Sequence, residues 1–523
     1  MRDDMVLVQH FLERSAQRSP GKTALITDAG RFAYREIDAM ANAVAHALVA
    51  DGLVKGDRVA VFLDNSLEAV VGLFGILKAG GVFVIVNPTM KGGKLAYILN
   101  NCGAAAALSA WRKHVVLAEA CSEVPTLRRV YLSGNPPVRA RHVGVPTASL
   151  TEILRDGRAT PPPPRSIDVD LAALIYTSGT QGTPKGVMMA HTNMVAVANS
   201  VIKFLGNTAD DIILNTLPMS FDYGLYQILM GFKVGATVIL DNAFAYPALT
   251  IERMVKERVT GFPIVPTISS ILLQMDGIKR HRFEHLRYIS NTAAFLPVEH
   301  IVKLRKLFPS TKLYSMYGLT ECKRVSYLPP EELDRRPTSV GKSIPNTEVF
   351  IVDQKGRPVG PGVTGELVVR GPHVMRGYWN DPKATAKKLS SDHYPGELVL
   401  YTGDLFRMDD EGYLYFVARK DDIIKTRGEK VSPKEVEAIL YGLEEITEAA
   451  VVGIPDPVLG EAIKAVVALK GGATLTAHRV LRHCSQHLED FMVPKYVEFR
   501  DSLPRTSRGK IDKRKLNGAG GRA

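Results

Sequence analysis

The chain has 523 residues, of which 46% are hydrophobic and 23% charged, with 44 glycines and 31 prolines. This composition is typical of a globular protein with several domains, and it excludes a disordered or collagen-like chain. The net charge of +12 is compatible with anionic ligands, but no nucleic-acid-binding motif accompanies it, so we expect no nucleic acid partner. The four cysteines are far apart and form no CxxC pair, which favours a reducing, cytoplasmic location.

The sequence of the N-terminal part predicts helices and strands of a soluble domain. Residues 1–20 are amphipathic and carry charges throughout, so we expect no secretory signal peptide. Apolar residues recur at helical spacing over 34–50, and 57–63 has the pattern of a buried strand. The most apolar stretch, 69–88, is interrupted by Lys78-Ala-Gly-Gly81, which predicts a short helix followed by a strand. We therefore expect no membrane span.

Strand-like and helix-like segments then alternate along the chain. Apolar, β-branched runs occupy 82–87, 173–178, 237–240, 261–266 and 286–291. Helical patterns lie between them, and this alternation is typical of an α/β protein with largely parallel sheets.

The pattern changes near residue 340. Short strands at 349–353, 365–371 and 413–419 are separated by Gly and Pro turns, which predicts a small β-barrel. A further β/α alternation begins near residue 420. We therefore divide the chain into a large domain, 1–420, and a small C-terminal domain, 421–523.

The strongest local motif is Tyr176-Thr-Ser-Gly-Thr-Gln-Gly-Thr-Pro-Lys-Gly186, between a predicted strand and a probable helix. Its glycines, hydroxyl groups and lysine give a loop rich in donors that can surround phosphate oxygens. It is not a Walker A loop, because Pro184 precedes the lysine and Gly186 follows it.

This loop closely resembles the signature loop of the AMP-forming adenylating superfamily, which includes acyl-CoA synthetases, amino-acid adenylation enzymes and luciferase. The resemblance extends in order over nearly the whole chain, through 314–321, 401–404, 418–437 and 504–514. Two departures are mild: the family usually has Thr at Gln181 and Gly at Ala418.

The resemblance implies how ATP is bound. Tyr317 would lie against the adenine, Asp404 would accept bonds from the ribose hydroxyls with Arg419 beside it, and Glu321 would bind Mg²⁺. The residues implied in phosphate binding are Thr177, Ser178, Gly179, Thr180, Gly182, Thr183, Lys185 and Thr320.

The resemblance also implies a mobile small domain. Lys510 would bridge the substrate carboxylate and the α-phosphate in the transition state. Asp421 would be the hinge about which the small domain rotates, removing Lys510 and bringing the Gly428 loop to the tunnel for the thiol.

Phe221 and Asp222 bear on the acid substrate. Many acyl-CoA and aryl-CoA synthetases have His at the Phe221 position, whereas the Ser-Phe-Asp run is similar to amino-acid adenylation domains, whose aspartate pairs with the substrate ammonium. A buried carboxylate is costly unless it is paired. The alternative is that backbone amides or a neighbouring cation satisfy Asp222.

Two further segments are expected to line the acyl pocket. Thr292 and Ala293 lie where the family usually has Gly and Ala, and the added bulk suggests a small acyl group. Lys323 and Arg324 follow Glu321, and the resemblance to β-amino-acid adenylating enzymes suggests a second carboxylate on the substrate. These cations could equally point outward or pair with Asp222.

We therefore predict an α/β fold, with two doubly wound subdomains and a β-barrel in the large domain and a mobile α+β small domain. The predicted function is adenylation of a carboxylic acid with Mg-ATP, then acyl transfer to the thiol of CoA or of a carrier protein's phosphopantetheine. A small amino or otherwise polar acid is the expected substrate. The alternative is an acyl-CoA synthetase for a plain fatty or aryl acid.

Overall fold

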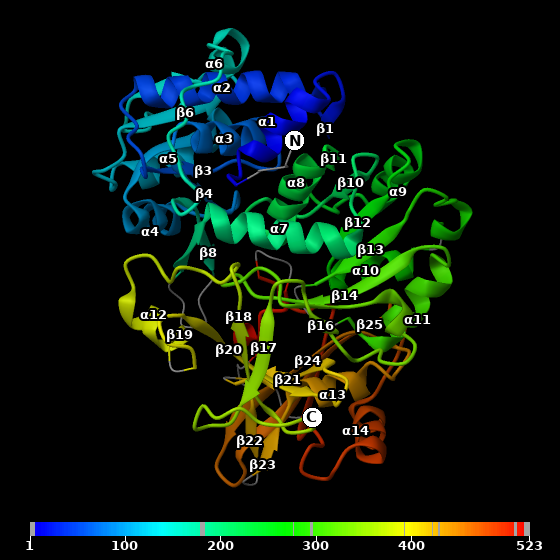
Figure 1. The fold of residues 1–523 in the computed structure, drawn as a ribbon. Helices are drawn as coiled ribbons and strands as arrows, with labels where there is room; N and C mark the ends of the chain where they lie inside the picture. Colours follow the sequence, from blue (N-terminus) through cyan, green and yellow to red (C-terminus); the bar gives the residue numbers. More distant parts are fainter. Residues whose placement is uncertain are drawn as a thin grey trace.

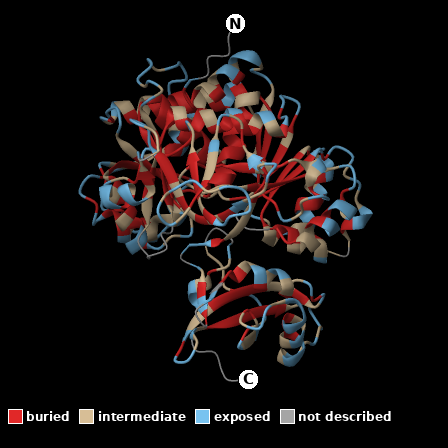
Figure 2. Ribbon diagram, turned by 60° about the horizontal axis from the view of Figure 1, so that its bottom comes forward, coloured by how far each residue is buried: buried red, intermediate tan, exposed pale blue. Residues whose placement is uncertain are grey.

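The computed structural model describes residues 6–177, 184–275, 277–292, 296–391, 393–420, 422–426, 429–506 and 510–516. A large body contains three sheets, and a smaller C-terminal lobe contains a fourth (Figures 1 and 2). None of the helices in these ranges has the length and apolarity that a membrane span requires.

The first sheet has seven strands in the order β7-β6-β5-β3-β4-β8-β9, and all neighbours are parallel except the last pair. Its strands are β3 (Arg58–Val61), β4 (Val82–Ile85), β5 (Ala104–Ala110), β6 (Arg129–Ser133), β7 (Thr147–Ser149), β8 (Leu171–Thr177) and β9 (Lys185–Ala190). Alternate strand residues enter two hydrophobic clusters, so both faces are covered by helices. These helices are α2 (Tyr34–Ala50), α3 (Leu67–Lys78) and α6 (Leu150–Asp156) on one face, and α4 (Gly92–Cys102) and α5 (His114–Cys121) on the other.

The second sheet has nine strands in the order β16-β15-β14-β13-β12-β10-β11-β1-β2, with a parallel centre and antiparallel edges. Its strands are β1 (Thr23–Thr27), β2 (Gly30–Ala33), β10 (Ile212–Asn215), β11 (Thr237–Leu240), β12 (Gly261–Ile264), β13 (Tyr288–Asn291), β14 (Lys312–Tyr317), β15 (Ser326–Leu328) and β16 (Lys342–Ser343). The helices of this region are α1 (His10–Arg18), α7 (His191–Leu205), α8 (Asp222–Val234), α9 (Pro247–Lys256), α10 (Pro266–Gln274) and α11 (Val298–Leu307).

The two sheets share one core through helices α3 and α8. The rings of Phe74 and Phe232 stack with their centroids 5.5 Å apart, and both side chains are fully buried. The two doubly wound units are therefore packed as one body.

The third sheet is antiparallel and represents the β-rich part predicted after residue 340. It contains β17 (Glu348–Val352), β18 (Gly365–Arg370), β19 (Leu389–Ser390), β20 (Val399–Met408) and β21 (Leu414–Arg419), with helix α12 (Pro382–Lys388) beside it. Hydrogen-bonded neighbours in this sheet follow the order β17-β18-β20-β19, and β21 also pairs with β20.

The small lobe has a hydrophobic core of its own. Its strands are β22 (Ile424–Thr426), β23 (Glu429–Val431), β24 (Ile446–Asp456), β25 (Gly460–Leu469) and β26 (Tyr496–Arg500), and its helices are α13 (Pro433–Leu440) and α14 (Ala477–His487). Within the described ranges, the two clusters of this core contain no residue from before position 424. Figure 2 shows this lobe below the main body.

Most predicted elements match the structure. The helix predicted over 34–50 is α2, and the apolar stretch 69–88 is divided into α3 and β4 at the predicted place. One local expectation was wrong: strand β9, and not a helix, follows the Gly- and Thr-rich loop. β9 pairs antiparallel with β8, so the loop connects the two strands of a hairpin.

Candidate active site

The motif predicted to bind phosphate joins strands β8 and β9. Thr177 and Lys185 are paired where the two strands end, and residues 178–183, which include Ser178, Gly179, Thr180, Gly182 and Thr183, lie outside the described part of the chain. Lys185 Nζ lies 3.7 Å from Asp381 Oδ2 and 5.3 Å from the centre of the Tyr378 ring. The hairpin thus places the lysine beside an acidic and an aromatic residue.

Asp404 is the most buried carboxylate among the predicted nucleotide-binding residues, with 4% of its surface exposed. The Tyr317 hydroxyl donates to its Oδ2 at 2.6 Å, and Arg419 Nε lies 3.3 Å from Oδ1. Burial raises the pKa of the Asp404 carboxyl and that of the Tyr317 phenol.

Asp404 retains an oxygen suited to a ligand. Within the described ranges, its buried Oδ1 accepts no hydrogen bond of acceptable geometry. This oxygen is ion-paired with Arg419 but accepts no hydrogen bond, and a ribose hydroxyl would supply one. The residues present therefore fit the sugar of ATP.

Glu321 and Thr320 lie in the tight turn after β14. The Tyr378 hydroxyl donates to Glu321 Oε1 at 2.6 Å, so Tyr378 contacts both Glu321 and Lys185. This shared neighbour brings the predicted metal ligand close to the phosphate-binding lysine. The described residues contain no group of three or more side chains arranged to hold a metal ion. A single carboxylate suits Mg²⁺, which takes its other ligands from phosphates and water.

Lys510 is one of the charged residues of the small lobe that affect the pKa of Lys434. Burial lowers the pKa of Lys434 to about 8, and the charges of Lys513 and Lys510 lower it further. The charge of Glu437 opposes this shift, and that of Asp404 opposes it to a smaller extent. Lys434 Nζ also lies 5.4 Å from the centre of the Phe416 ring on β21. Lys434 therefore interacts with charges from both parts of the chain, among them those of Lys510 and Asp404.

Two hydrogen bonds hold the small lobe against the large body. The Ser432 hydroxyl donates to the Val417 carbonyl at 2.6 Å, and Arg505 Nη1 donates to Thr267 Oγ1 at 2.5 Å. The predicted hinge, Asp421, and the Gly428 loop lie outside the described residues.

The predicted acyl-pocket residues are close together and buried. Phe221, Asp222, Thr292, Lys323 and Arg324 are each less than 9% exposed, and Ala293 lies outside the described residues. Lys323 Nζ lies 3.8 Å from Asp222 Oδ2, and Arg324 Nη1 donates to Thr292 Oγ1 at 2.5 Å. Asp222 therefore has a cation of its own chain as a neighbour, the arrangement that the sequence left open as an alternative.

Burial dominates the electrostatics of this cluster. It lowers the pKa of Lys323 to about 7, against the opposing effect of Asp222, and it lowers the pKa of Arg324. The Lys323 ammonium lies 5.1 Å from the Tyr223 ring centre and 4.8 Å from that of Tyr226. The aromatic rings and Asp222 together stabilise the charge that burial disfavours.

Sequence reasoning missed three tyrosines of this site. Tyr378 connects Lys185 with Glu321 but belongs to none of the motifs. Tyr223 and Tyr226 flank the cations, and their i, i+3 spacing directly after Asp222 was the available signal, because residues so spaced share one face of a helix.

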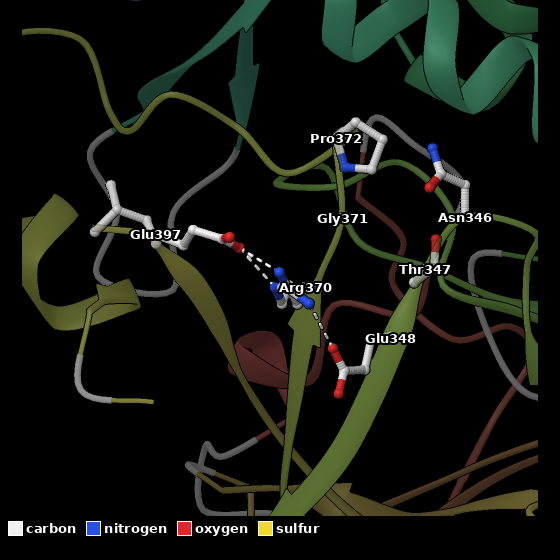
Figure 3. A pocket seen from close by; sticks show the side chains of 8 residues that line it. Asn346, Thr347, Glu348, Arg370, Gly371, Pro372 and Glu397 are labelled. Carbon is white, nitrogen blue, oxygen red and sulfur yellow. Dashed lines mark hydrogen bonds and ion pairs between the residues drawn. The ribbon is translucent and has the colours of Figure 1, made fainter. Parts of the chain in front are cut away.

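A separate open hollow of about 640 Å³ lies beside strands β17 and β18 (Figure 3). Arg370 lies between Glu348, at 2.9 Å, and Glu397, at 2.7 Å. The charged groups that line the hollow therefore pair with one another, and none of the predicted site residues lines this hollow.

A buried carboxylate with a free hydrogen-bond acceptor and cations nearby is compatible with an enzyme that uses a nucleotide to activate its substrate. The chain belongs to the AMP-binding enzyme family: the family's main domain matches residues 12–379, and the AMP-binding enzyme C-terminal domain matches 435–510. It is an AMP-forming acid–thiol ligase, and this class uses ATP and CoA.

Several similar proteins align with this chain over almost its whole length. A long-chain-fatty-acid–CoA ligase of Bacillus subtilis is 32% identical over 97% of this chain and 94% of its own. The structure of ATP-bound MatB from Rhodopseudomonas palustris is 30% identical, covers 97% of this chain and 98% of its own, and superposes with a TM-score of 0.86. The anthranilate CoA ligase AuaEII in complex with anthranoyl-AMP is 26% identical, covers 98% of this chain and 96% of its own, and gives a TM-score of 0.88.

Proposed function

We propose that the enzyme joins a small amino or otherwise polar carboxylic acid to the thiol of CoA through an acyl-adenylate. In the first step, a carboxylate oxygen attacks the α-phosphorus of ATP, the bond from that phosphorus to the bridging oxygen breaks, and pyrophosphate leaves. In the second step, the thiol sulfur attacks the acyl carbon, AMP leaves, and the thiol proton is released. A phosphopantetheine thiol of a carrier protein is the alternative acceptor.

The observation that carries this proposal is the buried Asp404 on β20 of the large body, whose charge reaches Lys434 of the small lobe. Its Oδ1, which accepts no hydrogen bond within the described ranges, suits a ribose, and Lys434 interacts with the charges of both Asp404 and Lys510. Lys510 would thus stabilise the charge that builds on the α-phosphate. Glu321 would hold Mg²⁺ on the phosphates, with Lys185, Thr320 and the loop 177–183 as further donors.

The proposed boundary between the two domains lies at residue 420, with Asp421 as the hinge. Support comes from the separate hydrophobic core that begins at Ile424. Rotation about this boundary would remove Lys510 after the first step, since only a few residues need to absorb the change.

The polar character of the acid is supported by the buried cluster of Asp222, Thr292, Lys323 and Arg324. A plain fatty or aryl acid would leave these groups without polar contacts from the substrate.

The test is substrate-dependent exchange of pyrophosphate into ATP. Wild-type protein should catalyse exchange with an acid of the right class, and Lys510→Ala should abolish exchange while ATP still binds. The matched control is Lys515→Ala, an exposed lysine of the same segment. Retained exchange in Lys510→Ala would overturn the role of that lysine, and absence of exchange with every acid would overturn the function.

A further inference from the structure

A short segment between strand β18 and helix α12 connects two parts of the site that are far apart in the sequence. Residues 376–379 run antiparallel beside β9, the edge strand of the seven-stranded sheet. Three backbone hydrogen bonds of 2.7 to 2.9 Å join this segment to residues 186–188. The preceding residue, Met375, donates its N–H to the Glu321 carbonyl at 2.8 Å. The segment is therefore fixed both to the strand that begins with Lys185 and to the turn that contains Glu321.

The side chain of Tyr378 lies between these two residues. It is 6% exposed, its hydroxyl donates to Glu321 Oε1 at 2.6 Å, and its ring centre lies 5.3 Å from Lys185 Nζ. Burial raises the pKa of the Tyr378 phenol, and the charge of Glu321 raises it further, so the phenol keeps its proton and remains a donor. One side chain thus orients a carboxylate and also contacts an ammonium group through its ring.

The backbone at Tyr378 is held closely on its other side. Its N–H donates to Thr385 Oγ1 at 2.9 Å. The neighbouring Gly377 has a φ of +125°, and a Cβ there would lie 2.7 Å from Thr385 Cγ2 and 3.3 Å from Met188 Cε. Only glycine fits this approach without displacing its neighbours. The position of the Tyr378 ring is therefore set by the packing around it, as preorganisation of a site requires.

Glu321 differs from other carboxylates that accept a hydrogen bond from a tyrosine. Elsewhere in the described ranges an arginine also pairs with the carboxylate: Arg129 with Asp51 beside Tyr131, Arg419 with Asp404 beside Tyr317, Arg370 with Glu348 beside Tyr394, and Arg336 with Asp409 beside Tyr415. Within the same ranges Glu321 has the phenol but forms no ion pair. A phenol orients a carboxylate without cancelling its charge. Glu321 therefore keeps the charge that a hard cation such as Mg²⁺ requires.

We propose that Tyr378 is a positioning residue, which holds the Glu321 carboxylate in the orientation that receives the metal ion of Mg-ATP and keeps it aligned with Lys185. This inference rests on the proposed function and adds to it a residue that lies outside the sequence motifs. The hydrogen bond to Oε1 restricts rotation of the carboxylate and leaves Oε2 to the cation. Groups that orient a metal-binding carboxylate typically contribute about 10- to 100-fold to metal affinity or activity.

The experiment compares nucleotide binding by the full chain and by Tyr378→Phe, measured by titration calorimetry. Phenylalanine keeps the ring beside Lys185 and removes the hydrogen bond to Glu321. The Kd for ATP in the presence of Mg²⁺ should rise by about 10- to 100-fold. The Kd for AMP in EDTA should not change, because AMP binds without the metal ion. The matched control is Tyr394→Phe, which removes a similar bond of 2.7 Å to Glu348 in the separate hollow and should leave both constants unchanged.

Two results of this comparison would overturn the inference. One is an unchanged Kd for Mg-ATP in Tyr378→Phe. The other is an equal loss of affinity for AMP in EDTA, since this would indicate that the phenol only stabilises the fold around the nucleotide.

A second set of variants tests whether Tyr378 acts through Glu321. In a Glu321→Gln background, Tyr378→Phe should change the Kd for Mg-ATP by less than twofold, because the carboxylate that it orients is already absent. Losses that multiply independently would refute the proposed link. Pyrophosphate exchange distinguishes this inference from the proposed function. Absence of exchange by the wild type with every acid would overturn the function, whereas wild-type exchange that Tyr378→Phe leaves unchanged would overturn only the positioning role.

Discussion

Replacement of Asp222 by Asn removes the carboxylate that lies beside the buried cation Lys323. At 3.8 Å and an effective dielectric constant of about 20, the attraction between Asp222 and Lys323 is worth about 4 kcal/mol. This is an upper limit for the loss, since a lysine with a pKa of about 7 can release its proton at little cost near neutral pH. We therefore expect Asp222→Asn to lower the free energy of unfolding by about 2–4 kcal/mol at pH 6 and by less at pH 9.

The dependence on pH has a defined sign. The pKa of Lys323 is about 7 in the folded protein, below its ordinary value of 10.5. Below pH 7 both states carry the ammonium, so the full cost of burying it is present. Between pH 7 and 10.5 the unfolded state binds more protons, and this cost disappears as the pH rises. Lys323→Met should therefore gain stability relative to the wild type below pH 7 and lose that advantage at high pH.

A double-mutant cycle with Asp222→Asn, Lys323→Met and the double variant isolates the pair. Both tryptophans, Trp111 and Trp379, lie in the large body, so their fluorescence during unfolding in urea reports on the part that contains the pair. The coupling energy should exceed about 1 kcal/mol at pH 6 and fall toward zero at pH 9. The same coupling at both pH values would refute the charge-based reasoning.

Three further outcomes are expected from the structure. Tyr317→Phe removes the hydrogen bond to the buried carboxylate of Asp404 and should lower the free energy of unfolding by about 1.5–3 kcal/mol, measured in urea; unchanged stability would contradict this. Arg505→Ala removes the hydrogen bond to Thr267. This variant should slow pyrophosphate exchange more than it slows acyl transfer from preformed adenylate to CoA. Equal losses in the two reactions would argue against a role of this contact in adenylation. Burial raises the pKa of the four cysteine thiols, Cys102, Cys121, Cys322 and Cys484. A thiol reagent at pH 8 should therefore label the protein only after unfolding, and rapid labelling of the native protein would contradict this expectation.

The sequence predicted the helices and strands, and it grouped the proposed nucleotide-binding residues more completely than those of the proposed acyl pocket. Periodicity was sufficient for α2 because one face of that helix is buried along its whole length. Asp404 and Tyr317 were identified by separate motifs 87 positions apart, and the structure joins them by a hydrogen bond. No pattern along the chain predicted that Tyr378 would connect Lys185 with Glu321, since such a contact depends on how three separate segments pack.

The acyl pocket shows why overall similarity and local chemistry carry different information. A relative that is 32% identical over 97% of this chain acts on long-chain fatty acids, as its name states. That similarity reflects the shared sheets and nucleotide site, whereas the substrate is selected by the few side chains that touch it. An alkyl chain placed against Arg324 and Lys323 would leave their donors unpaired, at about 1–3 kcal/mol for each group. That cost is large enough to discriminate by one or two orders of magnitude. The proposed polar substrate class therefore rests on these buried charges and not on the identity over the remaining chain.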